Sequence, residues 1–199
     1  MFTIAVTGGV ATGKSTVVGE LRGRLGPACD GFDCDQSVAE LLTLASIQAK
    51  IRQDFGDSVF SPGGDLDRRS LRERVFRDPL ERRKLESILH PEVLRRCRET
   101  QDAAETATPP RQWFVVDVPL LYEVGFPVAR DMVICTGCAP RTQINRLKSR
   151  PSIDEDTALQ IINAQLPQNE KFDRADAIVW TEGSKAGTRR QLELILALL

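Results

Sequence analysis

The feature that most constrains this chain is a glycine-rich segment near its amino terminus. Residues 8–15 read GGVATGKS and satisfy the pattern G-x-x-x-x-G-K-[ST]. The segment follows an apolar run over 2–6, expected to be a strand, and precedes a stretch over 15–25 with apolar residues at helical spacing. In such a strand–loop–helix unit, backbone N–H groups and the positive helix end face an anion. The sequence therefore predicts a cradle for a triphosphate.

Each polar residue of this loop is expected to contact a different part of a bound nucleotide. Lys14 is expected to reach the β- and γ-phosphates, the Ser15 hydroxyl to complete the shell of a Mg²⁺ ion, and Thr16 to contact the α-phosphate. ATP and Mg²⁺ are thus the expected cofactors. The expected nucleotide-binding residues of the loop are Gly9, Val10, Ala11, Thr12, Gly13, Lys14, Ser15 and Thr16.

The rest of the chain alternates short β-branched runs with longer amphipathic stretches, which is typical of a parallel sheet covered by helices. Between 35 and about 107 no convincing strand is present, and leucines recur at helical intervals among charged residues. This stretch is expected to be a helical lobe inserted between two strands. A last amphipathic helix is expected over 188–199. The expected strands are 2–6, a weaker one over 28–32, 113–116, 132–135 and 177–180.

Composition excludes several classes of protein. With 27 basic and 28 acidic residues the net charge is −1, so no overall field attracts nucleic acid or an anionic membrane. The amino terminus lacks the features of a secretory signal, and no apolar run approaches the length of a bilayer span. The 5 scattered cysteines fit a reducing compartment. We expect a soluble cytoplasmic protein, a monomer or weak homo-oligomer, that binds neither nucleic acid nor membrane.

Acidic residues follow two of the expected strands. Asp117 ends the apolar run over 113–116, where a P-loop protein places an acid near the metal, although an aspartate after a strand is common. Asp33 and Asp35 follow the weaker strand, at the carboxyl edge where open α/β sheets bind ligands. They could serve catalysis and substrate positioning, or Asp35 could cap the next helix while Asp33 merely ends a strand.

A basic cluster after the strand over 132–135 is a candidate lid. Arg146 and Arg150 are four residues apart on an expected helix, so both can point into a phosphate site, where forked guanidinium groups suit phosphate oxygens. A solvated basic helix face is the alternative. The acid and the basic residues together favour a kinase over a signalling GTPase, whose guanine-binding Asn-Lys-x-Asp element is absent.

A set of short elements occurs in a fixed order along the chain. They are residues 7–15, the Asp33-Cys34-Asp35 element, Leu71-Arg72 with Phe76, Leu89-His90-Pro91, residues 117–123, residues 143–150, Gln165, Lys171 and Ala175-Asp176. In this order and spacing they resemble the dephospho-CoA kinase family. The resemblance covers nearly the whole chain and departs from the family pattern at Thr181, where an asparagine is frequent, and at Trp180.

The resemblance implies an ATP-dependent enzyme that phosphorylates the ribose 3′-hydroxyl of dephospho-coenzyme A, giving coenzyme A and ADP. Asp33 would be the base or orienting carboxylate and Arg146, with Arg150, the lid arginine. The stretch from Pro119 to Glu123 would border the acceptor pocket. The acceptor-binding residues implied in this way are Thr7, Asp33, Asp35, Pro119, Leu120 and Glu123.

The expected fold class is therefore α/β, a P-loop NTPase three-layer sandwich with a central, mostly parallel five-stranded sheet. Residues 1–199 are expected to form a single kinase domain, in which 35–107 is the helical acceptor-binding lobe and about 140–155 a small helical lid.

Two other functions stay open from the residues alone. One is a small P-loop kinase acting on a nucleoside monophosphate or another metabolite hydroxyl, and the other is a regulatory protein that binds ATP without turnover. His90 is expected to be structural, because phosphoryl transfer needs little proton chemistry from a histidine. Cys135 and Cys138 have C-x-x-C spacing, but they lack recognisable partner ligands and do not open a helix, so neither zinc nor redox chemistry is expected.

Overall fold

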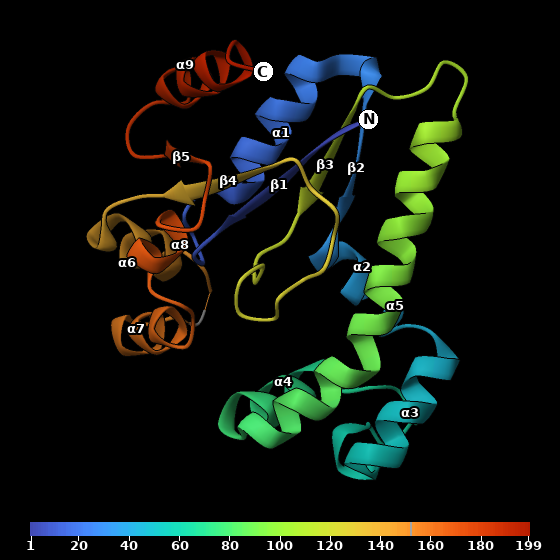
Figure 1. Cartoon of the computed structure of the whole chain (residues 1–199). Helices are drawn as coiled ribbons and strands as arrows, with labels where there is room; N and C mark the ends of the chain where they lie inside the picture. Colours follow the sequence, from blue (N-terminus) through green and yellow to red (C-terminus); the bar gives the residue numbers. More distant parts are fainter. Residues whose placement is uncertain (152) are drawn as a thin grey trace. The chain divides into compact units, whose positions relative to one another are not determined.

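The chain folds into two compact units, described here from a computed structural model that covers residues 1–151 and 153–199. One unit consists of Met1–Asp33 and Thr100–Leu199, and the other of Cys34–Glu99. The first unit contains the sheet and the second is helical (Figure 1). Within the described residues, no helix is long and apolar enough to cross a membrane.

The described strands form one five-stranded sheet with the order β2-β3-β1-β4-β5. Every pairing in it is parallel, so all carboxyl ends lie at the same edge. This confirms the predicted fold class, and the weak strand expected over 28–32 is present as β2. The strands are β1 (Phe2–Gly8), β2 (Cys29–Asp33), β3 (Trp113–Asp117), β4 (Met132–Gly137) and β5 (Ala177–Trp180).

Helices cover the sheet because its central strands are apolar on both faces. The side chains of Ile4 and Val6 in β1 belong to a buried cluster with Val17 and Leu21 of α1 and Leu192 of α9. Figure 1 shows α1 beside the sheet and α9 close to β5, the last strand of the order. The helices of this unit are α1 (Lys14–Leu25), the short η1 (Gly26–Ala28), α6 (Pro140–Lys148), α7 (Glu155–Asn163), α8 (Gln168–Phe172) and α9 (Lys185–Leu196).

The helical unit has a small core of its own. Ile47, Ile51 and Phe55 lie on one face of their helix at spacings of four residues, and all three are buried. The elements that supply this unit are α2 (Cys34–Leu41), α3 (Ala45–Phe55), η2 (Asp57–Val59), α4 (Arg68–Arg77) and α5 (Pro79–Thr106), whose last residues belong to the first unit.

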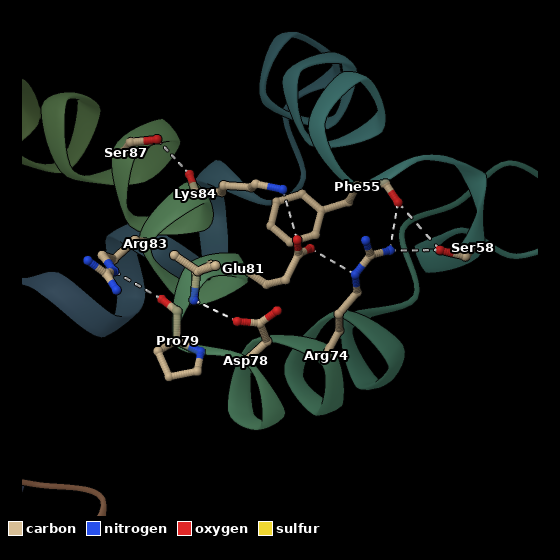
Figure 2. A network of polar contacts seen from close by, with 10 residues as sticks. Phe55, Ser58, Arg74, Asp78, Pro79, Glu81, Arg83, Lys84 and Ser87 are labelled. Atoms are coloured by element: carbon tan, nitrogen blue, oxygen red, sulfur yellow. Dashed lines mark hydrogen bonds and ion pairs between the residues drawn. The ribbon is translucent and has the colours of Figure 1, made fainter.

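A polar network joins the elements of the helical unit (Figure 2). Arg74 of α4 donates to the Phe55 carbonyl at 2.8 Å and to the Ser58 hydroxyl at 3.0 Å. Its Nε lies 2.8 Å from the Glu81 carboxylate, which also accepts from Lys84 at 2.8 Å. A cavity of about 380 Å³ is lined by Arg74 and Glu81 among others. Because these two side chains are engaged with one another and with the backbone, the network ties α3, α4 and α5 together.

Candidate functional site

The glycine-rich loop takes the backbone conformations that its pattern predicts. Gly8 has φ 153° and Gly13 φ 87°, both in the region that favours glycine. A Cβ atom on Gly8 would come within 2.1 Å of the Thr136 hydroxyl, and one on Gly13 within 2.9 Å of the Thr181 hydroxyl. Both positions therefore require glycine, for conformation and for space.

Two glutamine side chains hold the loop from outside. Gln143 of α6 donates to the Val10 carbonyl at 2.7 Å, and Gln165 accepts from the Val10 N–H at 2.7 Å. The N–H and the carbonyl of Val10 are thus both bonded to neutral side chains that are far away in the sequence. These two contacts brace the loop without adding a charge to it.

Buried hydroxyl groups support the loop from below. Thr12 is fully buried and donates to the Gly9 carbonyl at 2.7 Å. Its oxygen lies 2.7 Å from the hydroxyl of Thr136 in β4, which is also fully buried. Thr12 thus contributes its side chain to the interior of the protein, and its N–H also donates to the Gly9 carbonyl, at 3.3 Å.

The loop leads directly into α1 and leaves backbone donors available. Within the part of the chain that the structure describes, no hydrogen-bond acceptor engages the N–H groups of Gly13, Lys14 and Ser15. These are unpaired donors at a helix amino terminus, where the helix dipole also favours negative charge. The Ser15 side chain is exposed in the same turn, and Thr16 follows it.

The carboxyl ends of β2 and β3 bring the two candidate acids together. Asp33 and Asp117 are register partners in neighbouring parallel strands, and Val6, just before the loop, is the register partner of Asp117 on the other side. The Asp117 carboxylate is ion-paired with the Lys14 ammonium. The exposed fraction of these side chains is 6% for Asp117 and 13% for Lys14, so solvent screens the pair little. Lys14, Asp117 and Asp33 therefore share one edge of the sheet.

Arg146 connects α6 to the loop. Its guanidinium donates to the Ala11 carbonyl at 3.1 Å, to the Thr181 hydroxyl at 3.0 Å and to the Thr181 carbonyl at 2.7 Å. The Thr181 hydroxyl in turn donates to the Thr12 carbonyl at 2.6 Å. Arg146 is thus held against the loop by planar, multiple hydrogen bonds of the kind that a lysine cannot reproduce.

The residue after Thr181 fixes the start of the same helix. Glu182 accepts from the Thr142 hydroxyl at 2.6 Å and from the Ala139 N–H at 2.9 Å. The hydrogen bond from Thr142 is the main cause that holds the pKa of Glu182 below its ordinary value. An ionised carboxylate at a helix amino terminus also complements the helix dipole. Residues 181 and 182 therefore orient α6 and its arginine together.

The segment after β3 is fastened to its surroundings. The Thr7 hydroxyl, fully buried, donates to the Pro119 carbonyl at 3.4 Å. Glu123 lies 2.6 Å from the Lys171 ammonium and accepts from the Leu166 N–H at 3.1 Å. Thr7, Pro119 and Glu123, all expected near the acceptor, therefore take part in contacts that shape this segment.

The other expected site residues lie in various places. Leu120 follows Pro119 and is 36% exposed. Arg150 lies beyond Ser149, the C-cap of α6, and is exposed. Asp35 belongs to the helical unit, in the first turn of α2. Ser152, inside the stretch expected to form the lid, lies outside the described residues.

The burial of the cysteines and the set of possible metal ligands bear on the C-x-x-C pair and on the metal site. Cys135 and Cys138 are fully buried free thiols, and burial raises the pKa of Cys135 to about 11. Within residues 1–151 and 153–199, no group of at least 3 histidine, cysteine or acidic side chains could hold a metal ion. A Mg²⁺ ion at a phosphate site takes few protein ligands and keeps several waters, so the Ser15 hydroxyl and the Asp117 carboxylate suffice as its protein ligands.

Sequence reasoning assigned no contact to the residues that brace the loop. Gln143, Gln165 and Thr136 are distant from it in the chain, and a single glutamine or threonine carries no signal of its own. Thr181 stood out only as a departure from a family pattern, and the structure places it against Arg146 and the loop. Only the tertiary structure reveals these contacts.

Comparison with known proteins gives a consistent result. Residues 2–186 match the family described as dephospho-CoA kinase. A dephospho-CoA kinase of Anaeromyxobacter dehalogenans is 38% identical over 197 residues, covering 99% of this chain and 92% of the relative. One of Bacillus licheniformis is 37% identical over 193 residues, covering 97% and 94%. A crystal structure of a Thermus thermophilus protein superposes with a TM-score of 0.83 at 29% identity, covering 100% of this chain and 97% of that one.

The family match spans the phosphate loop, both acids and the arginine of α6, and the curated relatives are similar over nearly their entire length. This chain belongs to the dephospho-CoA kinase family.

Proposed function

We propose that this protein transfers the γ-phosphoryl group of ATP to the ribose 3′-hydroxyl of dephospho-coenzyme A, giving coenzyme A and ADP. One observation carries the proposal beyond family membership. Asp33 and Asp117 end adjacent parallel strands at the edge where the phosphate loop begins. This arrangement provides one carboxylate for the nucleotide side and a second, on the neighbouring strand, for an acceptor alcohol.

The phosphate loop would bind the β- and γ-phosphates through the N–H groups of Gly13, Lys14 and Ser15. The Lys14 ammonium would turn from Asp117 to the phosphate oxygens, because a triphosphate offers more negative charge than one carboxylate. The loop itself would move little, since Gln143 and Gln165 already hold its Val10 peptide.

Ser15 and Asp117 would hold Mg²⁺, after Lys14 has moved from Asp117 to the phosphates. The ion would supply positive charge that offsets the negative charge of the β- and γ-phosphates. The exposed Ser15 hydroxyl lies beside the free N–H groups of the first helical turn, which suits this task.

Asp33 would orient the acceptor hydroxyl and accept its proton as the new P–O bond forms. In a phosphoryl transfer with a loose transition state, such a group contributes mainly through positioning and a late proton transfer. Arg146, already against the loop, would donate to the oxygens of the migrating phosphoryl group, with Arg150 as a further donor. On the acceptor side we place Thr7, Asp35, Pro119, Leu120 and Glu123.

The remaining aspects of the proposal concern the cellular setting. We propose that the protein acts in the cytoplasm, as a monomer or weak homo-oligomer, with MgATP and dephospho-coenzyme A as its small-molecule substrates and without nucleic acid or membrane partners. The net charge of −1 supports this, because the protein as a whole does not attract a polyanion.

A coupled assay for ADP release tests the acceptor. We expect release with MgATP to depend on dephospho-coenzyme A, with the product carrying a 3′-phosphate. AMP, GMP and shikimate are the competing acceptors, and release with one of these but not with dephospho-coenzyme A would refute the proposal.

An Asp33→Asn variant tests the proposed base. It keeps the size and shape of the side chain, so ATP affinity is expected to stay within about twofold while turnover falls about 10²- to 10⁴-fold. Asp30→Asn is the matched control, because Asp30 lies in the same strand three residues before Asp33, on the opposite face, and its carboxylate accepts from the neighbouring Gly31 N–H. Full turnover by Asp33→Asn would remove the role assigned to this carboxylate.

A further inference from the structure

Lys171 in α8 is a fully buried lysine whose ammonium the proposed chemistry does not use. Its exposed fraction is 0%, and its Nζ lies 2.6 Å from the Glu123 carboxylate. Glu123 is the ion-pair partner recorded for it among the described residues. Because burying an ammonium away from water is costly, the position of this lysine depends strongly on that carboxylate.

Glu123 has a second contact to the same stretch of chain. Its carboxylate accepts from the Leu166 N–H at 3.1 Å. The preceding residue, Gln165, accepts from the Val10 N–H of the phosphate loop. Within the segment 165–171, Gln165 therefore contacts the phosphate loop. Leu166 and Lys171 contact Glu123, in the segment after β3.

Cys135 is a second titratable group near Lys171. Cys135 of β4 is close enough for Lys171 to lower its pKa and for Glu123 to raise it, but burial dominates and raises the Cys135 pKa to about 11. The thiol therefore stays protonated at neutral pH. Within the described residues, the ion-pair partner of Lys171 is Glu123, 2.6 Å away.

The segment that Glu123 anchors starts at the reacting edge of the sheet. It follows Asp117, the register partner of Asp33, and its Pro119 carbonyl accepts from the buried Thr7 hydroxyl. Between that bond and the ion pair at Glu123 lie Leu120 to Tyr122. The stretch is thus held at both ends, beside the carboxylate that we place at the acceptor alcohol.

We propose that Lys171 is a positioning residue that holds Glu123, and through it the segment 118–123, in the conformation that receives the acceptor. The inference rests on the proposed function, because it assigns this segment to the acceptor side of that reaction. Lys171 acts chiefly on the acceptor side, since Gln143 of α6 holds the phosphate loop independently of the segment 165–171.

A Lys171→Met variant is the first test, because methionine keeps most of the volume and removes the charge. We expect KM for dephospho-coenzyme A to rise about 10-fold or more, as small misplacements of a binding segment do. ATP affinity, measured without acceptor, is expected to stay within about twofold. Unchanged constants for both substrates, or an equal loss for both, would overturn the proposal.

A stability-matched control separates positioning from general destabilisation. Leu192→Ala removes a fully buried side chain from the cluster around α1 and α9 and is expected to destabilise by about 2–5 kcal/mol. We expect it to lower the melting temperature without a selective change in KM for the acceptor. The same selective change in this variant would mean that Lys171 acts only through stability.

A double variant keeps the test valid if Lys171→Met fails to fold. Lys171→Met with Glu123→Gln leaves no unpaired buried charge, and glutamine still accepts from the Leu166 N–H, so we expect stability to recover. The raised acceptor KM is expected to persist, and a normal acceptor KM would refute the positioning role. If the unaltered protein itself fails to phosphorylate dephospho-coenzyme A, the proposed function fails instead.

Discussion

Lys14 and Asp117 form an ion pair that joins the first residue of α1 to the last residue of β3. Both side chains are largely shielded from solvent, so each satisfies the charge of the other in the protein without nucleotide. In the proposed binding mode a triphosphate breaks this pair, because the same ammonium moves to the phosphates. The pair therefore sets an energetic cost on nucleotide binding that one substitution can remove.

Replacing Asp117 with asparagine releases Lys14 while keeping the shape of the side chain. Affinity for ATP in the presence of a metal chelator is expected to be equal to or higher than that of the unaltered protein. Turnover with Mg²⁺ is expected to fall about 100-fold, because the substitution removes the proposed metal ligand. Equilibrium dialysis and the coupled assay measure the two effects. Weaker metal-free binding would show that the ion pair supports the loop and does not compete with the nucleotide.

The Thr181 hydroxyl links Arg146 to the loop, because it accepts from the guanidinium and donates to the Thr12 carbonyl. Thr181→Val removes it at nearly constant volume and leaves the buried Thr12 carbonyl without that donor. We expect a loss of about 1 kcal/mol in unfolding free energy and a similar loss in ATP binding, roughly fivefold in Kd. Thr181→Ser, which keeps the hydroxyl, is the control and is expected to behave like the unaltered protein in denaturant unfolding and nucleotide titration.

Glu81 of the helical unit gives a pH-dependent signal. The hydrogen bond from Lys84, followed in effect by the charges of Arg74 and Lys84, lowers the pKa of Glu81 against the opposing effect of burial. A carboxyl with a lowered folded-state pKa adds stability above its ordinary pKa of about 4.5, and that stability is lost as pH falls through the lowered value.

Glu81→Gln should therefore be less stable than the unaltered protein near neutral pH, with a gap that narrows as the pH falls below about 4.5. Urea unfolding across that range measures the gap. Glu73→Gln is the control, since the Glu73 side chain is 51% exposed and its i,i+4 partner Arg69 is 89% exposed, so its gap is expected to stay small throughout. A gap for Glu81→Gln that does not depend on pH would contradict the assignment.

Thiol reactivity tests the reading of the cysteine pair. Cys135 and Cys97 are buried with pKa values raised to about 11 by burial, and Cys138 is buried too, so these thiols are expected to react with Ellman's reagent only after unfolding. Cys29, which is half-buried, should react first. Fast reaction of Cys135 and Cys138 in the folded protein would contradict this prediction and favour a redox or metal-binding role.

Much of this protein was predictable from local patterns. The strands 2–6 and 113–116, the loop over 8–15 and the following helix are each encoded within a few residues, because continuous apolar runs and the placement of glycine act locally. The parallel sheet follows from the alternation of strands and helices, since parallel strands need long crossovers.

Other properties depend on which strands become neighbours. The sequence alone determined that a phosphate loop exists and which residues line it, since the required conformations belong to Gly8 and Gly13 themselves. Only the tertiary structure decided that Asp33 stands beside Asp117 and that Lys171 is buried against Glu123. These pairings join residues far apart in the chain, and their energies come from register and burial, which no local pattern specifies.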